Sequence, residues 1–293
     1  MLHNFISSRI RAELPFEPTE QQSVLLDALG EFVMSTESEK IFLLRGYAGT
    51  GKTSVVSALV RALNALQQKT MLLAPTGRAA KVIAGYSGFP AFTIHKRIYR
   101  QKSMAEFRFQ LADNLFNHTL FIVDEASMIS NTGGDTEFGS GRLLDDLIEF
   151  VYGGDGCSLL LLGDTAQLPP VMQPHSPALE KDKLAGYGLR VYDFTLTHVV
   201  RQALESGILH NATRLREMLR EEQTTEFPTF ELEGFSDIRH LNGMDLIDEI
   251  QRAYNGVGVE DTIVVTRSNK RANMYNNGIR NRVLMKEDEL TNG

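Results

Sequence analysis

Gly46-Tyr47-Ala48-Gly49-Thr50-Gly51-Lys52-Thr53 is the stretch of sequence that decides the fold of this chain. It fits the pattern G-x-x-x-x-G-K-[ST], with an apolar run before it at Ile41–Leu44 and apolar residues at helical spacing after it at Thr53–Leu66. Glycines let the backbone curl so that successive N–H groups point at phosphate oxygens, and the N-terminus of the following helix adds its dipole. Lys52 can reach the β- and γ-phosphates, and the Thr53 hydroxyl can ligate Mg²⁺. The stretch therefore predicts a nucleoside triphosphate site; the alternative is an ordinary Gly-rich turn before a helix.

Apolar runs alternate with helical stretches along the chain, which predicts parallel βαβ units and an α/β fold of the P-loop type. The runs are almost continuously apolar, as are strands of a sheet that is covered on both faces. They are Thr70–Ala74, Thr119–Val123 and Ser158–Leu162.

A second α/β pattern follows a connection at residues 182–190. It comprises strands at Arg190–Thr195 and Thr262–Thr266 and helices at Ile208–Arg220, Met244–Tyr254 and Arg267–Leu284. We therefore expect a helical segment at 1–17, a first domain at 18–187 and a second domain at 188–293. Within the first domain, the Gly-rich residues 131–142 predict a surface loop.

The composition is typical of a soluble globular protein. The 293 residues are 42% hydrophobic and 23% charged, which excludes a collagen-like or disordered chain. The single cysteine, Cys157, excludes an internal disulfide framework and a multi-Cys zinc site. There is no apolar run of the ~20 residues that span a bilayer and no signal-peptide core, so we expect a cytoplasmic protein without membrane contact.

The charge is unevenly distributed along the chain. The net charge of −7 argues mildly against a nucleic-acid partner, but residues 1–100 carry a net charge of +5 and the remainder −12.

The second candidate element is an apolar run that ends in two carboxylates, Asp124 and Glu125. Open α/β sheets bind ligands at the carboxyl ends of their strands. We expect Asp124 to hold Mg²⁺, and Glu125 to orient and deprotonate the attacking water. The alternative is a helix N-cap with an acidic first turn.

A third element, Gly163-Asp164-Thr165-Ala166-Gln167-Leu168-Pro169-Pro170-Val171, is more specific. Gln167 is a neutral donor and acceptor that can touch both the γ-phosphate and its water. The pattern G-D-x-x-Q-L-P-P-V resembles motif III of superfamily-1 helicases, and is most similar to the 5′-to-3′ branch with the RecD-like and Dda-like enzymes. The resemblance implies an ATP-binding, RecA-like parallel-sheet domain with Mg²⁺ as cofactor.

Four further segments extend this resemblance. Pro18–Gln22 resembles the family's Q motif, which implies that Gln22, or less favourably Gln21, recognises adenine. Leu196–Gln202 resembles the motif that supplies an arginine finger, here Arg201; the alternative is a surface arginine. The segment with Pro75, Thr76 and Arg78 resembles motif Ia, and the segment with Thr93 and His95 resembles motif Ib. In the family both motifs contact the single strand, so these five residues are candidate DNA contacts. For His95 an ordinary packed histidine is an equal alternative.

An insert at about residues 99–117 alternates in polarity around Phe107 and Phe109, which predicts a small β-hairpin. In the family such an insert is the pin that splits the duplex, and these two rings could stack on bases. The favoured alternative is a connecting hairpin whose two phenylalanines pack inward.

The family's motifs V and VI are not found in the sequence, so we expect an incomplete second RecA-like domain at 188–293. The resemblance implies an ATP-dependent DNA helicase that moves 5′-to-3′ on single-stranded DNA. It also implies tailed duplex DNA as substrate, repair or recombination subunits as partners, and a monomeric state. Two alternatives stay open: an ATP- and nucleic-acid-binding module without unwinding activity, and a P-loop ATPase that acts on protein.

Overall fold

The computed structural model describes residues 2–101, 108–133, 137–198, 206–221 and 227–285. The chain divides into two compact units, Met1–Phe230 and Glu231–Gly293. No helix in the described part of the chain is long and apolar enough to cross a membrane.

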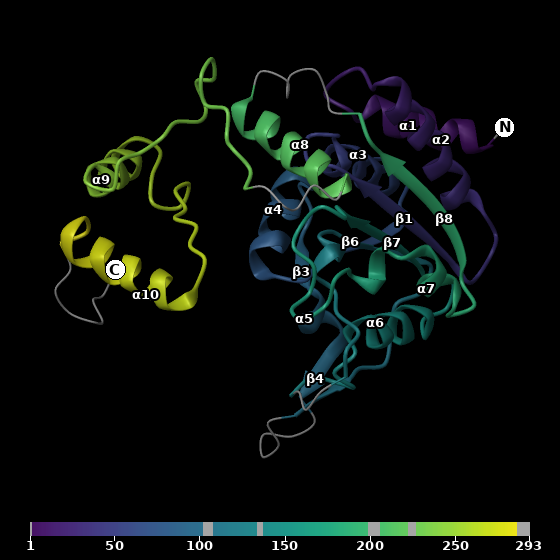
Figure 1. The fold of residues 1–293 in the computed structure, drawn as a ribbon. Helices are drawn as coiled ribbons and strands as arrows, with labels where there is room; N and C mark the ends of the chain where they lie inside the picture. Colours follow the sequence, from purple (N-terminus) through teal and green to yellow (C-terminus); the bar gives the residue numbers. More distant parts are fainter. Residues whose placement is uncertain (1, 102–107, 134–136, 199–205, 222–226, 286–293) are drawn as a thin grey trace. The chain divides into compact units, whose positions relative to one another are not determined.

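The first unit is built on a six-stranded sheet in which every neighbouring pair of strands is parallel (Figure 1). The strand order is β3-β2-β6-β7-β1-β8. The bounds are β1 Lys40–Gly46, β2 Lys69–Ala74, β3 Ala91–Thr93, β6 Thr119–Val123, β7 Ser158–Gly163 and β8 Arg190–Leu196. The predicted α/β class and the apolar runs chosen as strands are therefore confirmed.

Helices cover the two faces of this sheet. One face is covered by α1 Leu2–Ala12, α2 Glu20–Met34, α3 Lys52–Ala65 and α4 Gly77–Ser87. The other is covered by α5 Ile94–Ile98, α6 Leu143–Tyr152, the 3₁₀ turns η1 Ala126–Met128 and η2 Pro177–Leu179, and α7 Lys181–Ala185. The unit also contains α8 Gly207–Arg220.

Alternate residues of the central strands enter opposite cores, which explains their continuous apolar character. Ile41 and Leu43 of β1 lie in the cluster on the α6 side, whereas Phe42 and Leu44 lie in the cluster on the α3 side. All four are 0–1% exposed. Because both faces are buried, the strands lack the polar alternation of a half-exposed sheet.

A separate two-stranded antiparallel ribbon is formed by β4 Tyr99–Gln101 and β5 Phe109–Leu111. It confirms the hairpin predicted for the insert, although residues 102–107, with Phe107, lie outside the described part of the chain.

The structure corrects the predicted domain boundary at 187/188. Arg190–Leu196 is a strand of the first sheet, not of a second one, because β8 pairs in parallel with β1 from Lys40↔Arg190 to Gly46↔Leu196. The second unit contains α9 Leu246–Gly256 and α10 Asn269–Arg282, and no strand among its described residues, 231–285. The predicted strand at Thr262–Thr266 is therefore wrong: the described residues of that unit include no strand with which it could pair.

Candidate nucleotide-binding site

The P-loop follows β1 and curls back into α3. Gly49 and Gly51 have φ values of +76° and +84°, a region that favours glycine. At Gly51 a Cβ atom would also lie 2.5 Å from the side-chain nitrogen of Gln22. The sequence pattern of glycines is thus required both by backbone conformation and by the close approach of α2.

Lys52 is the first residue of α3, and its ammonium group lies across the loop. It donates hydrogen bonds to the backbone oxygens of Gly46 at 2.6 Å and Tyr47 at 3.0 Å. Burial lowers the pKa of Lys52, while the carboxylates of Asp164, Asp124 and Glu125 oppose that shift. A half-buried cation whose hydrogen bonds go to neutral backbone oxygens can exchange them for the oxygens of an anionic ligand.

Asp124 and Glu125 follow the end of β6. In the sheet, β6 lies next to β7, and β7 lies next to β1, the strand that precedes the P-loop. The Glu125 N–H donates to Asp124 Oδ1 at 2.9 Å, and Glu125 has a left-handed backbone with φ of +56°. Such a conformation costs a non-glycine residue about 1–2 kcal/mol and is concentrated at functional sites. Burial raises the pKa of both carboxyls, and the neighbouring Asp124 raises that of Glu125 further.

Gln167 connects the loop after β7 to this acidic pair. Its Oε1 accepts a hydrogen bond from Ser127 Oγ at 3.2 Å, and a side-chain hydrogen bond from Gln167 favours the ionised form of Glu125. The predicted residues Lys52, Glu125 and Gln167 thus come together at the carboxyl ends of neighbouring parallel strands, as the topology requires.

Asp164 is a site residue that sequence reasoning missed. Its Oδ2 accepts a hydrogen bond from the Ala48 N–H at 3.0 Å and its Oδ1 accepts one from the Ala166 N–H at 2.9 Å. Arg216 of α8 approaches Oδ2 at 3.9 Å and lies over the Tyr47 ring. The G-D of the motif was visible in the sequence, but nothing in it indicated the P-loop as the partner of the aspartate.

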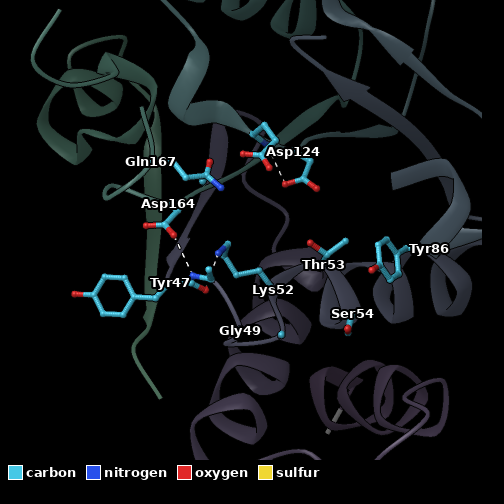
Figure 2. A pocket seen from close by; sticks show the side chains of 13 residues that line it. Tyr47, Gly49, Lys52, Thr53, Ser54, Tyr86, Asp124, Asp164 and Gln167 are labelled. Atoms are coloured by element: carbon cyan, nitrogen blue, oxygen red, sulfur yellow. Dashed lines mark hydrogen bonds between the residues drawn. The ribbon is translucent and has the colours of Figure 1, made fainter. Parts of the chain in front are cut away.

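These groups surround a cavity of about 320 Å³ (Figure 2). Its lining consists of P-loop residues, the two carboxylates after β6, Gly163 at the end of β7, and Asp164 and Gln167 after that strand. Ser54 and Tyr86, which were not predicted, also line it. Thr53 and Asp124, the expected magnesium ligands, both line it. A hydroxyl and a buried carboxylate are oxygen donors of the kind that Mg²⁺ prefers beside phosphates, so the residues fit that ion.

Gln22 and Gln21 each have a structural role. Gln22 is 1% exposed; its Oε1 accepts from the Thr19 N–H and its Nε2 donates to the Thr50 oxygen at 2.9 Å. Gln21 binds the end of β8, where Thr197 and His198 donate their N–H groups to its Oε1. The structure thus places Gln22 against the P-loop, and its recognition of adenine stays a prediction.

A larger cavity of about 960 Å³ adjoins the first and shares Asp124, Glu125 and Gln167 with it. Thr76 and Arg78, predicted DNA contacts, line this groove, and Pro75 directly precedes them. Most of the remaining lining is apolar or small, with Ala79, Val82, Met128, Leu168, Pro169, Pro170 and Val171 among it.

The other predicted DNA contacts have partners within the protein. Thr93 caps α5 by accepting from the Lys96 N–H. The half-buried His95 ring packs on Tyr99 and Phe138, and burial lowers its pKa. Phe109 stacks on Phe138 at 4.6 Å and packs against the core, so the inward-packed alternative holds for this ring. Phe107 and Arg201 lie outside the described residues.

Comparison with known families identifies this arrangement. A family model described as an AAA domain matches residues 26–231, a range that contains every residue lining the nucleotide cavity. The chain belongs to the AAA-domain family. Within 195 residues it is 31% identical to the ATP-dependent RecD2 DNA helicase of Deinococcus radiodurans, which confirms the RecD-like resemblance. That match covers 66% of this chain and 23% of the relative.

Other similarities of this AAA-domain chain are more distant. It is 25% identical over 187 residues to uncharacterized protein R530 of Acanthamoeba polyphaga mimivirus, covering 53% of this chain and 34% of that protein. The chain therefore spans about a quarter to a third of these relatives. Its fold is similar to that of Pif1 helicase from Candida albicans, with a TM-score of 0.50 and 18% identity over 92% of this chain and 55% of the other.

Proposed function

We propose that this chain is the ATPase core of a RecD-like DNA helicase, which couples ATP hydrolysis to 5′-to-3′ movement along single-stranded DNA. The observation that carries the proposal is the sharing of Asp124, Glu125 and Gln167 between the nucleotide cavity and the adjoining groove. Any rearrangement of these side chains during hydrolysis also changes the wall of the groove.

Within the nucleotide cavity, Lys52 leaves the backbone oxygens of Gly46 and Tyr47 and binds the phosphates of ATP. Glu125 accepts the proton of the attacking water, a role that suits a carboxylate whose pKa burial raises above that of an ordinary glutamate. Gln167, which bonds to Glu125 and Ser127, orients that water and senses the loss of the terminal phosphate. Thr53 and Asp124 would hold Mg²⁺, which when bound neutralises charge on the phosphate oxygens.

The groove offers what an unstacked strand needs. Leu168 and Val171 are 86% and 87% exposed, and Met128 and Val82 are each 47% exposed. Exposed apolar side chains gathered in one groove mark a binding surface, and bases present apolar faces to it. Arg78 supplies a positive charge for a phosphate at the rim, and Thr76 lies beside it.

Two predicted features complete this scheme. Arg201 supplies a cation to the γ-phosphoryl group of the bound ATP. The β4–β5 ribbon stands where the duplex divides, and separates the strands as the motor advances.

The central experiment is ATP hydrolysis with and without single-stranded DNA. We expect the DNA to stimulate turnover, and Lys52→Ala to reduce kcat by about 10²–10³, the usual effect of removing one donor to a transition-state charge. Lys181→Ala, at an exposed position of α7, is the matched control and is expected to leave turnover unchanged.

Unwinding of 5′-tailed and 3′-tailed duplexes decides the rest. Opening of only the 5′-tailed substrate supports the proposal. Binding of DNA without opening either substrate assigns the chain to a nucleic-acid-binding module, and turnover that is insensitive to DNA assigns it to an ATPase that acts on protein.

A further inference from the structure

The carboxylate of Asp146, on α6, is a buried junction outside the nucleotide site. It is 4% exposed, and three donors converge on it. Tyr99 Oη and the Ser140 N–H donate to Oδ2 at 2.6 and 3.0 Å, and Ser140 Oγ donates to Oδ1 at 2.7 Å. Burial and this hydrogen bond raise the pKa of Tyr99, so the hydroxyl keeps its proton and remains a donor.

The three hydrogen bonds secure both strands of the β4–β5 ribbon. Tyr99 is the first residue of β4. Ser140 follows a segment that pairs with β5, in which the Phe109 N–H donates to the Glu137 oxygen at 2.7 Å and the Gly139 N–H donates to the Phe109 oxygen at 2.9 Å. Asp146 therefore connects one strand directly and the other through residues 137–140.

Aromatic rings fill the space between these segments. Phe138 stacks on Phe109 with an interplanar angle of 16°, and its centroid lies 5.1 Å from His95 and 5.7 Å from Tyr99. A Cβ atom on Gly139, whose φ is +52°, would lie 2.1 Å from Asp146 Oδ2. The glycine thus allows the segment to approach the carboxylate this closely.

The ribbon needs such a base. Each strand has only three residues, and an isolated two-stranded ribbon is marginal in water. The same helix is also bonded to the segment that follows Glu125, because the Leu144 N–H donates to the Ser130 oxygen and Asn131 Nδ2 donates to Asp145 Oδ1. Ribbon and nucleotide site are therefore attached to one end of α6.

We propose that Asp146 is a positioning residue for strand separation: with Tyr99 and Ser140 it holds the ribbon base rigid on α6. Force on the ribbon is then passed to the ATPase core instead of bending the ribbon. This inference rests on the proposed function, in which the ribbon meets the duplex.

The test compares two adjacent aspartate–tyrosine pairs on α6. Tyr99→Phe and Asp146→Asn loosen the ribbon. Tyr187→Phe is the matched control, because Tyr187 Oη donates to Asp145 and ties the helix to the 182–190 connection instead. Two readouts are taken on the full chain: hydrogen exchange of the Phe109 and Gly139 amides, and base pairs opened per ATP hydrolysed on a 5′-tailed duplex.

We expect Tyr99→Phe to raise exchange of both amides about tenfold, the population change for a hydrogen bond worth about 1.4 kcal/mol. Base pairs opened per ATP fall by a similar factor, while DNA-stimulated ATPase stays within about twofold of the unmodified chain. The Tyr187→Phe control changes neither the amide exchange nor the number of base pairs opened per ATP.

Three results are decisive against the inference or its premise. Unchanged amide exchange in both ribbon variants overturns the inference. An ATPase loss that parallels the unwinding loss also overturns it, because Asp146 then supports the core as a whole. Absence of unwinding by the unmodified chain, with amide exchange raised in the variants, overturns the proposed function but leaves the ribbon anchor intact.

Discussion

Asp164 Oδ2 accepts a hydrogen bond from the Ala48 N–H at 3.0 Å, which joins the loop after β7 to the P-loop. The two residues lie just beyond the carboxyl ends of β7 and β1, which are parallel neighbours in the sheet, and are 116 positions apart in sequence. The same carboxylate also caps the Ala166 N–H. It therefore holds the loop that carries Gln167 in a fixed relation to the loop that binds phosphate.

Asp164→Ala leaves two backbone N–H groups without their acceptor. We expect the free energy of unfolding to fall by about 1–3 kcal/mol and KM for ATP to rise, because both loops relax. Urea unfolding and ATPase titration measure the two effects. Asp27→Ala, exposed on α2, serves as control and changes stability by no more than about 0.5 kcal/mol. An unaltered KM in the Asp164 variant would show that the bond does not shape the phosphate site.

The pH dependence of kcat/KM for ATP follows from two shifted groups. As pH falls, Glu125 is protonated through a pKa above that of an ordinary glutamate, mainly because it is buried. As pH rises, Lys52 loses its proton below the pKa of an ordinary lysine, again mainly through burial. We therefore expect a bell-shaped profile that is narrower than the one that the ordinary pKa values of glutamate and lysine would give.

Glu125→Gln tests the acidic limb of that profile. It is expected to lower kcat by about 10²–10⁴ and to abolish the limb, since no base is left to titrate. Glu149→Gln, exposed on α6, keeps the full profile. Persistence of the limb in the Glu125 variant would assign it to another group.

Gln22→Ala separates two roles for the glutamine. Because its amide is held by Thr19 and Thr50, we expect a loss of stability of about 1–3 kcal/mol and an equal rise in KM for ATP and GTP. The measurement is the ratio of kcat/KM for the two nucleotides, with Gln21→Ala alongside. A fall in kcat/KM that is confined to ATP would instead assign adenine recognition to Gln22.

Arg78→Ala tests whether the groove binds the phosphate backbone of single-stranded DNA. If Arg78 binds one phosphate, its removal lowers the slope of log affinity against log salt by about 0.7 for a single strand. Fluorescence anisotropy with a labelled oligonucleotide at several salt concentrations measures this slope. Arg11→Ala, exposed on α1, is the control. Equal slopes for all three proteins would remove Arg78 from the DNA path.

The sequence by itself determined the nucleotide site to a large extent. The residues of Gly46–Thr53 have local conformational requirements, and the apolar runs before Asp124 and Gly163 could only be buried strands. Since parallel strands end at one edge of a sheet, these local signals were enough to bring Lys52, Glu125 and Gln167 together.

Only the tertiary structure decided which distant segments are partners. Periodicity describes how a segment is buried but not which strand lies beside it, so β8 was assigned to the wrong unit although its bounds were nearly correct. For the same reason the sequence did not reveal that Asp164 bonds to Ala48, that Phe109 faces Phe138, or that Asp146 gathers three donors. Each of these contacts is a hydrogen bond or ring pair between remote residues, and its geometry exists only after the sheet has formed.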